Sequence, residues 1–155
     1  MNEIPVPIGE SVRFEKTVSE SDVYLFAGIT GDLNANHVNE AFMRKTEFGQ
    51  RIAHGALILG FVSTASTQMI ELGLSRSDNF VPVSVGYDRV RFIAPVFIGN
   101  TITVDYTISA IDQNKLRTIA EIEINTDDER LVVVAQHHLK WIPIDQSARK
   151  SKVAS

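Results

Sequence analysis

Residues 31–66 read GDLNANHVNEAFMRKTEFGQRIAHGALILGFVSTAS, and this stretch decides how the chain folds. Its second half runs into one long predicted helix, from about Ala56 to Leu72, with Gly73 where a glycine often ends a helix. Apolar residues follow one another in the first half of this helix and leave it no polar face, which predicts a helix buried on all sides. Other parts of the chain must therefore wrap around it.

Strand patterns dominate the second half of the chain. Residues 101–111 alternate almost strictly between apolar and polar side chains, which is typical of a strand with one buried face. Further strands are predicted at residues 11–18, 83–92, 116–125 and 131–142, and short helices at residues 22–28 and 39–45. The strands predicted at residues 101–111, 116–125 and 131–142 follow one another through turns, which predicts an antiparallel meander. Pattern alone indicates an α+β protein with one separate sheet.

Length and composition predict one globular domain over residues 1–145, followed by a polar, disordered tail over residues 146–155. The chain has 155 residues, of which 44% are hydrophobic and 22% charged, as in ordinary globular proteins. Its formal net charge of -4 gives no general attraction to nucleic acid or to an anionic membrane. No export signal is recognisable, and no apolar run approaches the ~20 residues of a spanning helix. We therefore expect a cytoplasmic protein without a nucleic-acid or membrane partner.

An acid, an imidazole and a glycine that opens a helix lie close together in residues 31–66. Asp32 and His37 would point about 140° apart on a helix, so they converge only if a folded-back turn separates them. The asparagines between them, Asn34 and Asn36, favour such a turn. The glycine of the His54-Gly55 pair lets a ligand come close to the free N–H groups that open a helix. This arrangement is suited to binding an oxyanion.

These residues resemble the (R)-specific enoyl-CoA hydratases of the MaoC-like dehydratase family. The matching features are D-x-N-x-x-H at Asp32, Asn34 and His37, the F-G-x-R-I-A-H-G block at residues 48–55, Ser63, and RFIAPVFIGNTITV at residues 91–104. Many members carry Asn-Pro after the aspartate, whereas this chain has Asn34-Ala35. The resemblance implies a hot-dog fold, in which a bent antiparallel sheet wraps around a long central helix. It also implies a homodimer or a dimer of dimers, in which sheets pair edge to edge.

The resemblance further implies reversible hydration of a trans-2-enoyl-CoA, or of an acyl-carrier-protein thioester, to the (R)-3-hydroxyacyl thioester. This reaction needs a base for water, a proton donor for the α-carbon and a positive dipole at the thioester oxygen. By resemblance, Asp32 and His37 act jointly on one water, and the Gly55 N–H receives the thioester oxygen. Ser63, Asn34 and His54 complete the candidate substrate-binding set. No cofactor and no metal is implied.

Each candidate also has a plain structural interpretation. Asp32 suits a turn or helix cap, Asn34 suits simple turn chemistry, and the Ser63 hydroxyl suits a bond to the carbonyl four residues earlier. His54 suits packing at the mouth of the helix. Two rival functions also fit the resemblance: a hot-dog thioesterase acting on acyl-CoA, and a non-catalytic acyl-CoA-binding or regulatory module.

Other polar residues give weaker signals. His137 and His138 are adjacent in a predicted strand, so their side chains point to opposite faces and form no common metal site. Metal binding by Asp32, His37 and His54 lacks any HExxH or thiolate pattern. The candidates for binding the phosphates of CoA are Arg44, Lys45, Arg51, Arg89 and Arg91.

Overall fold

The structure is a computed structural model that describes residues 3–145, so the predicted tail at residues 146–155 lies outside the described residues. In chain order the elements are β1 (Ser11–Thr17), α1 (Glu20–Thr30), α2 (Ala35–Val38), α3 (Glu40–Met43), α4 (Gly55–Gly60), α5 (Val62–Arg76), β2 (Phe80–Phe92), β3 (Thr101–Asp112), β4 (Arg117–Thr126) and β5 (Leu131–Pro143). All five predicted strands are present, with ends shifted by a few residues.

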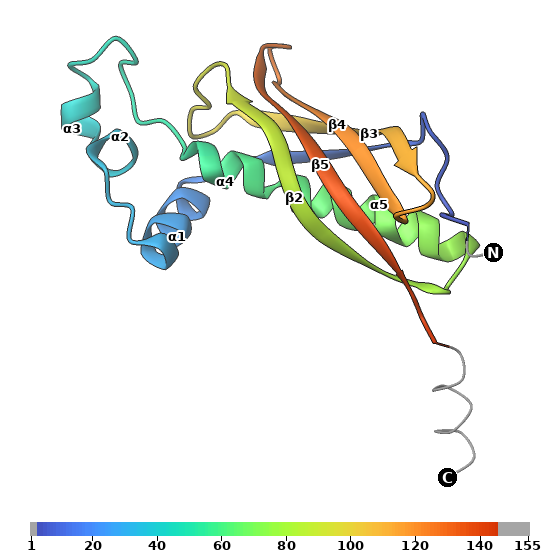
Figure 1. Ribbon diagram of the computed structural model, residues 1–155. Coiled ribbons are helices and arrows are strands. Elements are labelled where there is room, and N and C mark those ends of the chain that lie inside the picture. The colour runs from blue at the N-terminus through green and yellow to red at the C-terminus, as the bar shows by residue number, and fades with distance from the viewer. Residues whose placement is uncertain (1–2, 146–155) are drawn as a thin grey trace.

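The strands form one antiparallel sheet in the order β1-β3-β4-β5-β2. Figure 1 shows α4 and α5 running along one face of this bent sheet, while α1, α2 and α3 gather beside the start of α4. The predicted meander is β3-β4-β5, in which consecutive strands pair. A bent antiparallel sheet packed along a long helix is the arrangement that the family resemblance implied.

The core lies between α5 and the inner face of the sheet. Alternate residues of β3, including Ile102, Val104 and Tyr106, are fully buried, as the alternation predicts. They meet a stripe on α5 that includes Val62 and Met69, both also fully buried. The buried face of β3 and the buried stripe of α5 therefore form one core.

The long helix differs from its prediction at both ends. It is interrupted at Phe61, which separates α4 from α5. Gly73 does not end α5, which continues to Arg76; a Cβ at Gly73 would lie 2.7 Å from Cη2 of Trp141. This glycine is needed because the helix passes closely over the Trp141 ring. It is not needed to stop the helix.

The prediction of a helix buried on all sides is wrong for this single chain. Ala56, Gly60, Ser63 and Thr64 are exposed, because the sheet covers only one side of the helix. The helical stretch Gly55–Arg76, 22 residues, is nevertheless long and apolar enough to cross a membrane, which corrects the expectation that no run has this length. Here the stretch packs along the sheet. Length and apolar composition alone do not distinguish a membrane span from the core helix of a soluble protein.

Candidate active site

The segment after α1 folds back as the asparagines predict. Gly31 ends α1 with a left-handed φ of 78°. The Asp32 carboxylate then accepts the N–H of Asn34 at 3.2 Å, and the Asn34 side chain accepts the N–H of Asn36 at 3.1 Å. Asn34 thereby caps α2, which begins at Ala35. Since proline also fits the first position of a helix, Ala35 in place of proline is compatible with the same start.

The His37 ring is held by a backbone carbonyl. Its Nδ1 lies 2.8 Å from the carbonyl oxygen of Ile52, and the N–H of Ile52 in turn donates to the carbonyl of Asn36 at 3.1 Å. A ring nitrogen that faces a carbonyl oxygen must carry the proton. In the neutral imidazole Nε2 is therefore the nitrogen with the free lone pair.

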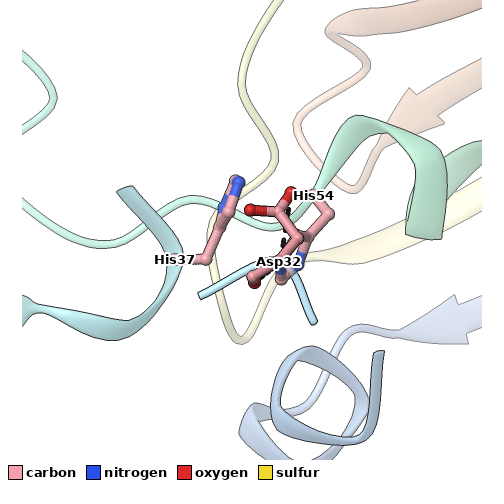
Figure 2. A group of neighbouring side chains, drawn as sticks. All are labelled: Asp32, His37 and His54. Atoms are coloured by element: carbon pink, nitrogen blue, oxygen red, sulfur yellow. Dashed lines mark hydrogen bonds and ion pairs between the residues drawn. The ribbon is translucent and has the colours of Figure 1, made fainter. Parts of the chain in front are cut away.

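His54 is the most deeply buried member of the cluster, with 2% of its surface exposed. Its Nε2 lies 3.1 Å from the backbone oxygen of Asp32 and 4.0 Å from the Asp32 carboxylate. The ring stacks on His37, with centroids 3.7 Å apart and planes 27° apart, and it also contacts Phe26 at 4.9 Å. Figure 2 shows the side chains of Asp32, His37 and His54 gathered beside the start of α4.

The spacing of the cluster matches a bridging water. One polar atom from each of Asp32, His37 and His54 lies within 4.8 Å of the other two. Two atoms that each bind the same water at ~2.8 Å lie about 4.6 Å apart. Asp32 is half exposed, so its carboxylate is open to solvent, whereas the imidazoles are more enclosed. The acid and the imidazole separated by five residues are therefore brought together.

The same cluster suits a metal ion poorly. Imidazole lone pairs lie in the ring plane, so two rings stacked at 27° direct their lone pairs side by side and not toward one point. In addition, Nδ1 of His37 and Nε2 of His54 each face a backbone carbonyl oxygen. The geometry favours hydrogen bonding to a small polar ligand.

A cavity of about 380 Å³ opens beside His37 and Gly55. Its other lining residues are mostly apolar: Phe48, Ile52, Ala53, Ile58, Phe92, Ile93, Ala94, Pro95, Val96 and Val133. A Cβ at Gly55 would lie 2.9 Å from the ring of Phe92, so only glycine fits the opening of α4 without moving that ring. The cavity thus joins an imidazole, a helix-opening amide and an apolar chamber.

Ser63 does not join this cluster. It is exposed on α5, beyond the interruption at Phe61, and does not line the cavity. Its carbonyl oxygen accepts the hydroxyl of Thr67 at 3.0 Å. The group that sequence reasoning missed is the carbonyl of Ile52, which orients His37; a backbone carbonyl carries no side-chain signature.

Two of the five basic candidates for phosphate binding are engaged in ion pairs. Arg51 contacts Glu20 at 2.5 Å, Glu40 at 3.2 Å and the Tyr24 hydroxyl at 3.0 Å, and the bond to Glu20 raises the pKa of Arg51. Arg44 also pairs with Glu40. Arg51 therefore ties α1 and α3 to the segment that leads into α4.

The two adjacent histidines of β5 point to opposite faces, as expected. His137 is buried on the inner face. The side chain of His138 pairs with Asp88 at 3.0 Å. Neither residue belongs to the cluster around Asp32.

Comparison with known proteins gives consistent matches. The MaoC-like domain family model matches residues 3–129. An (R)-specific enoyl-CoA hydratase of Rhodospirillum rubrum is 41% identical over 107 residues, which are 69% of this chain and 69% of that protein. A 3-hydroxybutyryl-CoA dehydratase of Methylorubrum extorquens is 32% identical over 142 residues, which are 91% of this chain and 83% of that protein.

Solved structures agree with these sequence matches. The (R)-hydratase from Aeromonas caviae involved in PHA biosynthesis has a TM-score of 0.77 at 25% identity, and the match covers 89% of this chain and 98% of that one. The likeness confirms the predicted hot-dog fold, with its bent sheet and long helix.

Proposed function

Because the chain belongs to the MaoC-like domain family and is a hydro-lyase, we propose that it hydrates a trans-2-enoyl-CoA to the (R)-3-hydroxyacyl-CoA and catalyses the reverse dehydration. One observation carries the proposal: Asp32 and His37 present polar atoms within the span of one bridging water, and His37 shares a cavity with Gly55. A carrier-protein thioester presents the same reacting atoms. The expected cytoplasmic location stays a prediction.

His37 is the general base of the proposed hydration. Its proton on Nδ1 is held by the Ile52 carbonyl, so the Nε2 lone pair takes a proton from the water as the oxygen attacks the β-carbon. The Asp32 carboxylate accepts the second hydrogen of the water and stabilises the imidazolium. The Nε2–H then delivers the proton to the α-carbon on the same face, which gives net syn addition of water.

The Gly55 amide is the proposed oxyanion donor. Negative charge develops on the thioester oxygen as the enolate forms, and an N–H at the start of α4 meets it with the positive end of the helix dipole. The apolar chamber beyond, with Ile58 and Val133 in its wall, is suited to the acyl group. The Asn34 side chain serves by holding the turn that carries Asp32.

We also infer a homodimer that forms through β2. This strand pairs with β5 on one edge and lies at the end of the sheet order, so its other edge has no partner strand among the described residues. Val81, Val83 and Val85 on β2 are exposed. Pairing of β2 with its copy around a two-fold axis would satisfy the free edge and cover these side chains. Light scattering at micromolar concentration that gives the mass of one chain would contradict the dimer.

The reaction is tested with a series of trans-2-enoyl-CoA substrates of increasing acyl length. We expect loss of the enoyl absorbance without release of free thiol, and an (R)-3-hydroxyacyl product in chiral analysis. Release of thiol would instead identify a thioesterase. Asp32→Asn and His37→Ala should each lower kcat by roughly 10²-fold to 10⁴-fold.

The chain offers a matched control for these two substitutions. Asp88 and His138 form another carboxylate–imidazole pair, but they lie on the sheet and do not line the cavity. Asp88→Asn and His138→Ala should leave kcat and KM close to those of the unsubstituted protein. If Asp32→Asn and His37→Ala are equally harmless, the catalytic role of the pair is refuted and a binding module is favoured.

A further inference from the structure

The side chain of His54 has an unusual position for the residue that precedes a helix. His54 is the N-cap of α4, but its side chain makes no capping hydrogen bond. The ring is 2% exposed and lies between His37 and Phe26. Its Nε2 faces the backbone oxygen of Asp32 at 3.1 Å. The side chain is therefore used by the catalytic cluster and not by the helix.

We propose that His54 is a positioning residue, which sets the relative placement of Asp32, His37 and the Gly55 amide without touching substrate. This inference rests on the proposed hydration, whose acid–base pair it concerns. It replaces the substrate-binding role that the sequence suggested for His54.

Two contacts fix the orientation of the His37 ring. The bond from Nδ1 to the Ile52 carbonyl fixes one point of the ring, but a single hydrogen bond leaves the ring free to turn about that bond. The flat face of His54, stacked at 3.7 Å and 27°, removes this freedom. Together the two contacts hold Nε2 of His37 in one direction.

His54 also contacts the segments that carry the other two groups, Asp32 and the Gly55 amide. Because Nε2 of His54 faces a carbonyl oxygen, it carries the proton and donates to Asp32, which fixes the backbone of the turn. The carbonyl of His54 accepts the N–H of Ile58 at 3.1 Å and so opens α4, and the next amide is that of Gly55. One residue thus joins acid, base and oxyanion donor, and a misplacement of ~1 Å in such a set can cost about 10²-fold in rate.

Packing alone does not explain an imidazole at this position. Nδ1 of His54 is buried and has no hydrogen-bond partner among residues 3–145. A buried acceptor without a partner is unfavourable, and a phenyl ring would fill the same space between His37 and Phe26 without that penalty. The donor at Nε2 is what phenylalanine cannot supply.

Two substitutions separate the contacts that His54 makes. His54→Phe keeps a flat ring against His37 but loses the donor to Asp32, whereas His54→Gln keeps a donor but loses the flat ring. We expect each to lower kcat about 10-fold to 10²-fold while KM changes less than about threefold. A rise in KM with unchanged kcat would show direct substrate binding and overturn the proposal.

A double-substitution cycle tests whether His54 acts through His37. With His37→Ala already present, His54→Gln should lower kcat by a smaller factor than it does in the unsubstituted protein, because the ring on which His54 stacks is gone. Full additivity of the two losses would overturn the proposal.

A measurement without substrate keeps the test independent of the proposed reaction. In nitrogen NMR of the unsubstituted protein, His54 should carry its proton on Nε2 and His37 on Nδ1. His54→Gln, which loses the stacked ring, should weaken the His37 preference, whereas His54→Phe should keep it. A proton on Nδ1 of His54, or an unchanged His37 signal in the His54→Gln variant, overturns the positioning role. If these signals behave as expected but no enoyl-CoA is hydrated, the proposed function fails and the positioning role stands.

Discussion

Mild acid is expected to destabilise the protein through the buried imidazole of His137. The residue is 1% exposed on the inner face of β5, where Nδ1 lies 3.0 Å from the Tyr106 hydroxyl and Nε2 lies 2.8 Å from the Ser84 hydroxyl. The Tyr87 ring stacks on it at 4.4 Å. Burial, with a smaller contribution from neighbouring His138, lowers the pKa of His137 from 6.5 to about 4.

The sign and size of the effect follow from this pKa. Above the unfolded pKa of ~6.5, the His137 imidazole is neutral in both states and the folded protein keeps its full stability. Between pH 6.5 and about 4 the unfolded chain binds a proton that the folded protein excludes, so the free energy of unfolding falls as the pH falls. The total loss is about 3 kcal/mol, of which about 2 kcal/mol has occurred by about pH 5.

Urea unfolding at several pH values measures this loss, with the fluorescence of Trp141, the single tryptophan, as the signal. The control is His137→Gln, which removes the titrating group and is expected to be less stable near neutral pH. As the pH falls from about 7.5 to about 5, the difference between the free energies of unfolding of the two proteins should shrink by about 2 kcal/mol. A constant difference over this range would refute the reasoning, as would an NMR titration of His137 with a midpoint near ~6.5.

Four further substitutions test the scaffold by thermal or urea unfolding. Gly73→Ala should destabilise by about 1–3 kcal/mol, because its Cβ would lie 2.7 Å from the Trp141 ring. Gly28→Ala lies on the exposed side of α1, where an added Cβ would meet no atom of the other described residues within 4 Å outside its own helix turn, and it should be neutral or stabilise by up to about 1 kcal/mol. Equal effects at the two glycines would contradict the close helix–sheet contact. Ser19→Ala removes the capping box of α1 and should cost about 0.5–2 kcal/mol. Arg51→Met removes the contacts with Glu20, Glu40 and Tyr24, which join α1 and α3 to the segment before α4. It should lower the free energy of unfolding by about 1–2 kcal/mol and also lower kcat. An unchanged kcat would show that these contacts do not support the site.

The sequence by itself determined what is encoded locally. Period-two alternation predicted β3, and asparagine chemistry predicted the turn between Asp32 and His37, because both depend on neighbouring residues alone. The ordered motif from Asp32 to Gly55 predicted the family, since few folds need that combination of residue types.

Only the tertiary structure decided how distant segments meet. The carbonyl of Ile52 selects the tautomer of His37, the side chain of His54 turns toward the backbone of Asp32, and Ser63 lies on the exposed side of α5. Gly73 lies within α5 because Trp141 of β5 passes over it. These outcomes depend on backbone groups and on close contacts across the sheet, and neither leaves a periodic or compositional trace in the order of the residues.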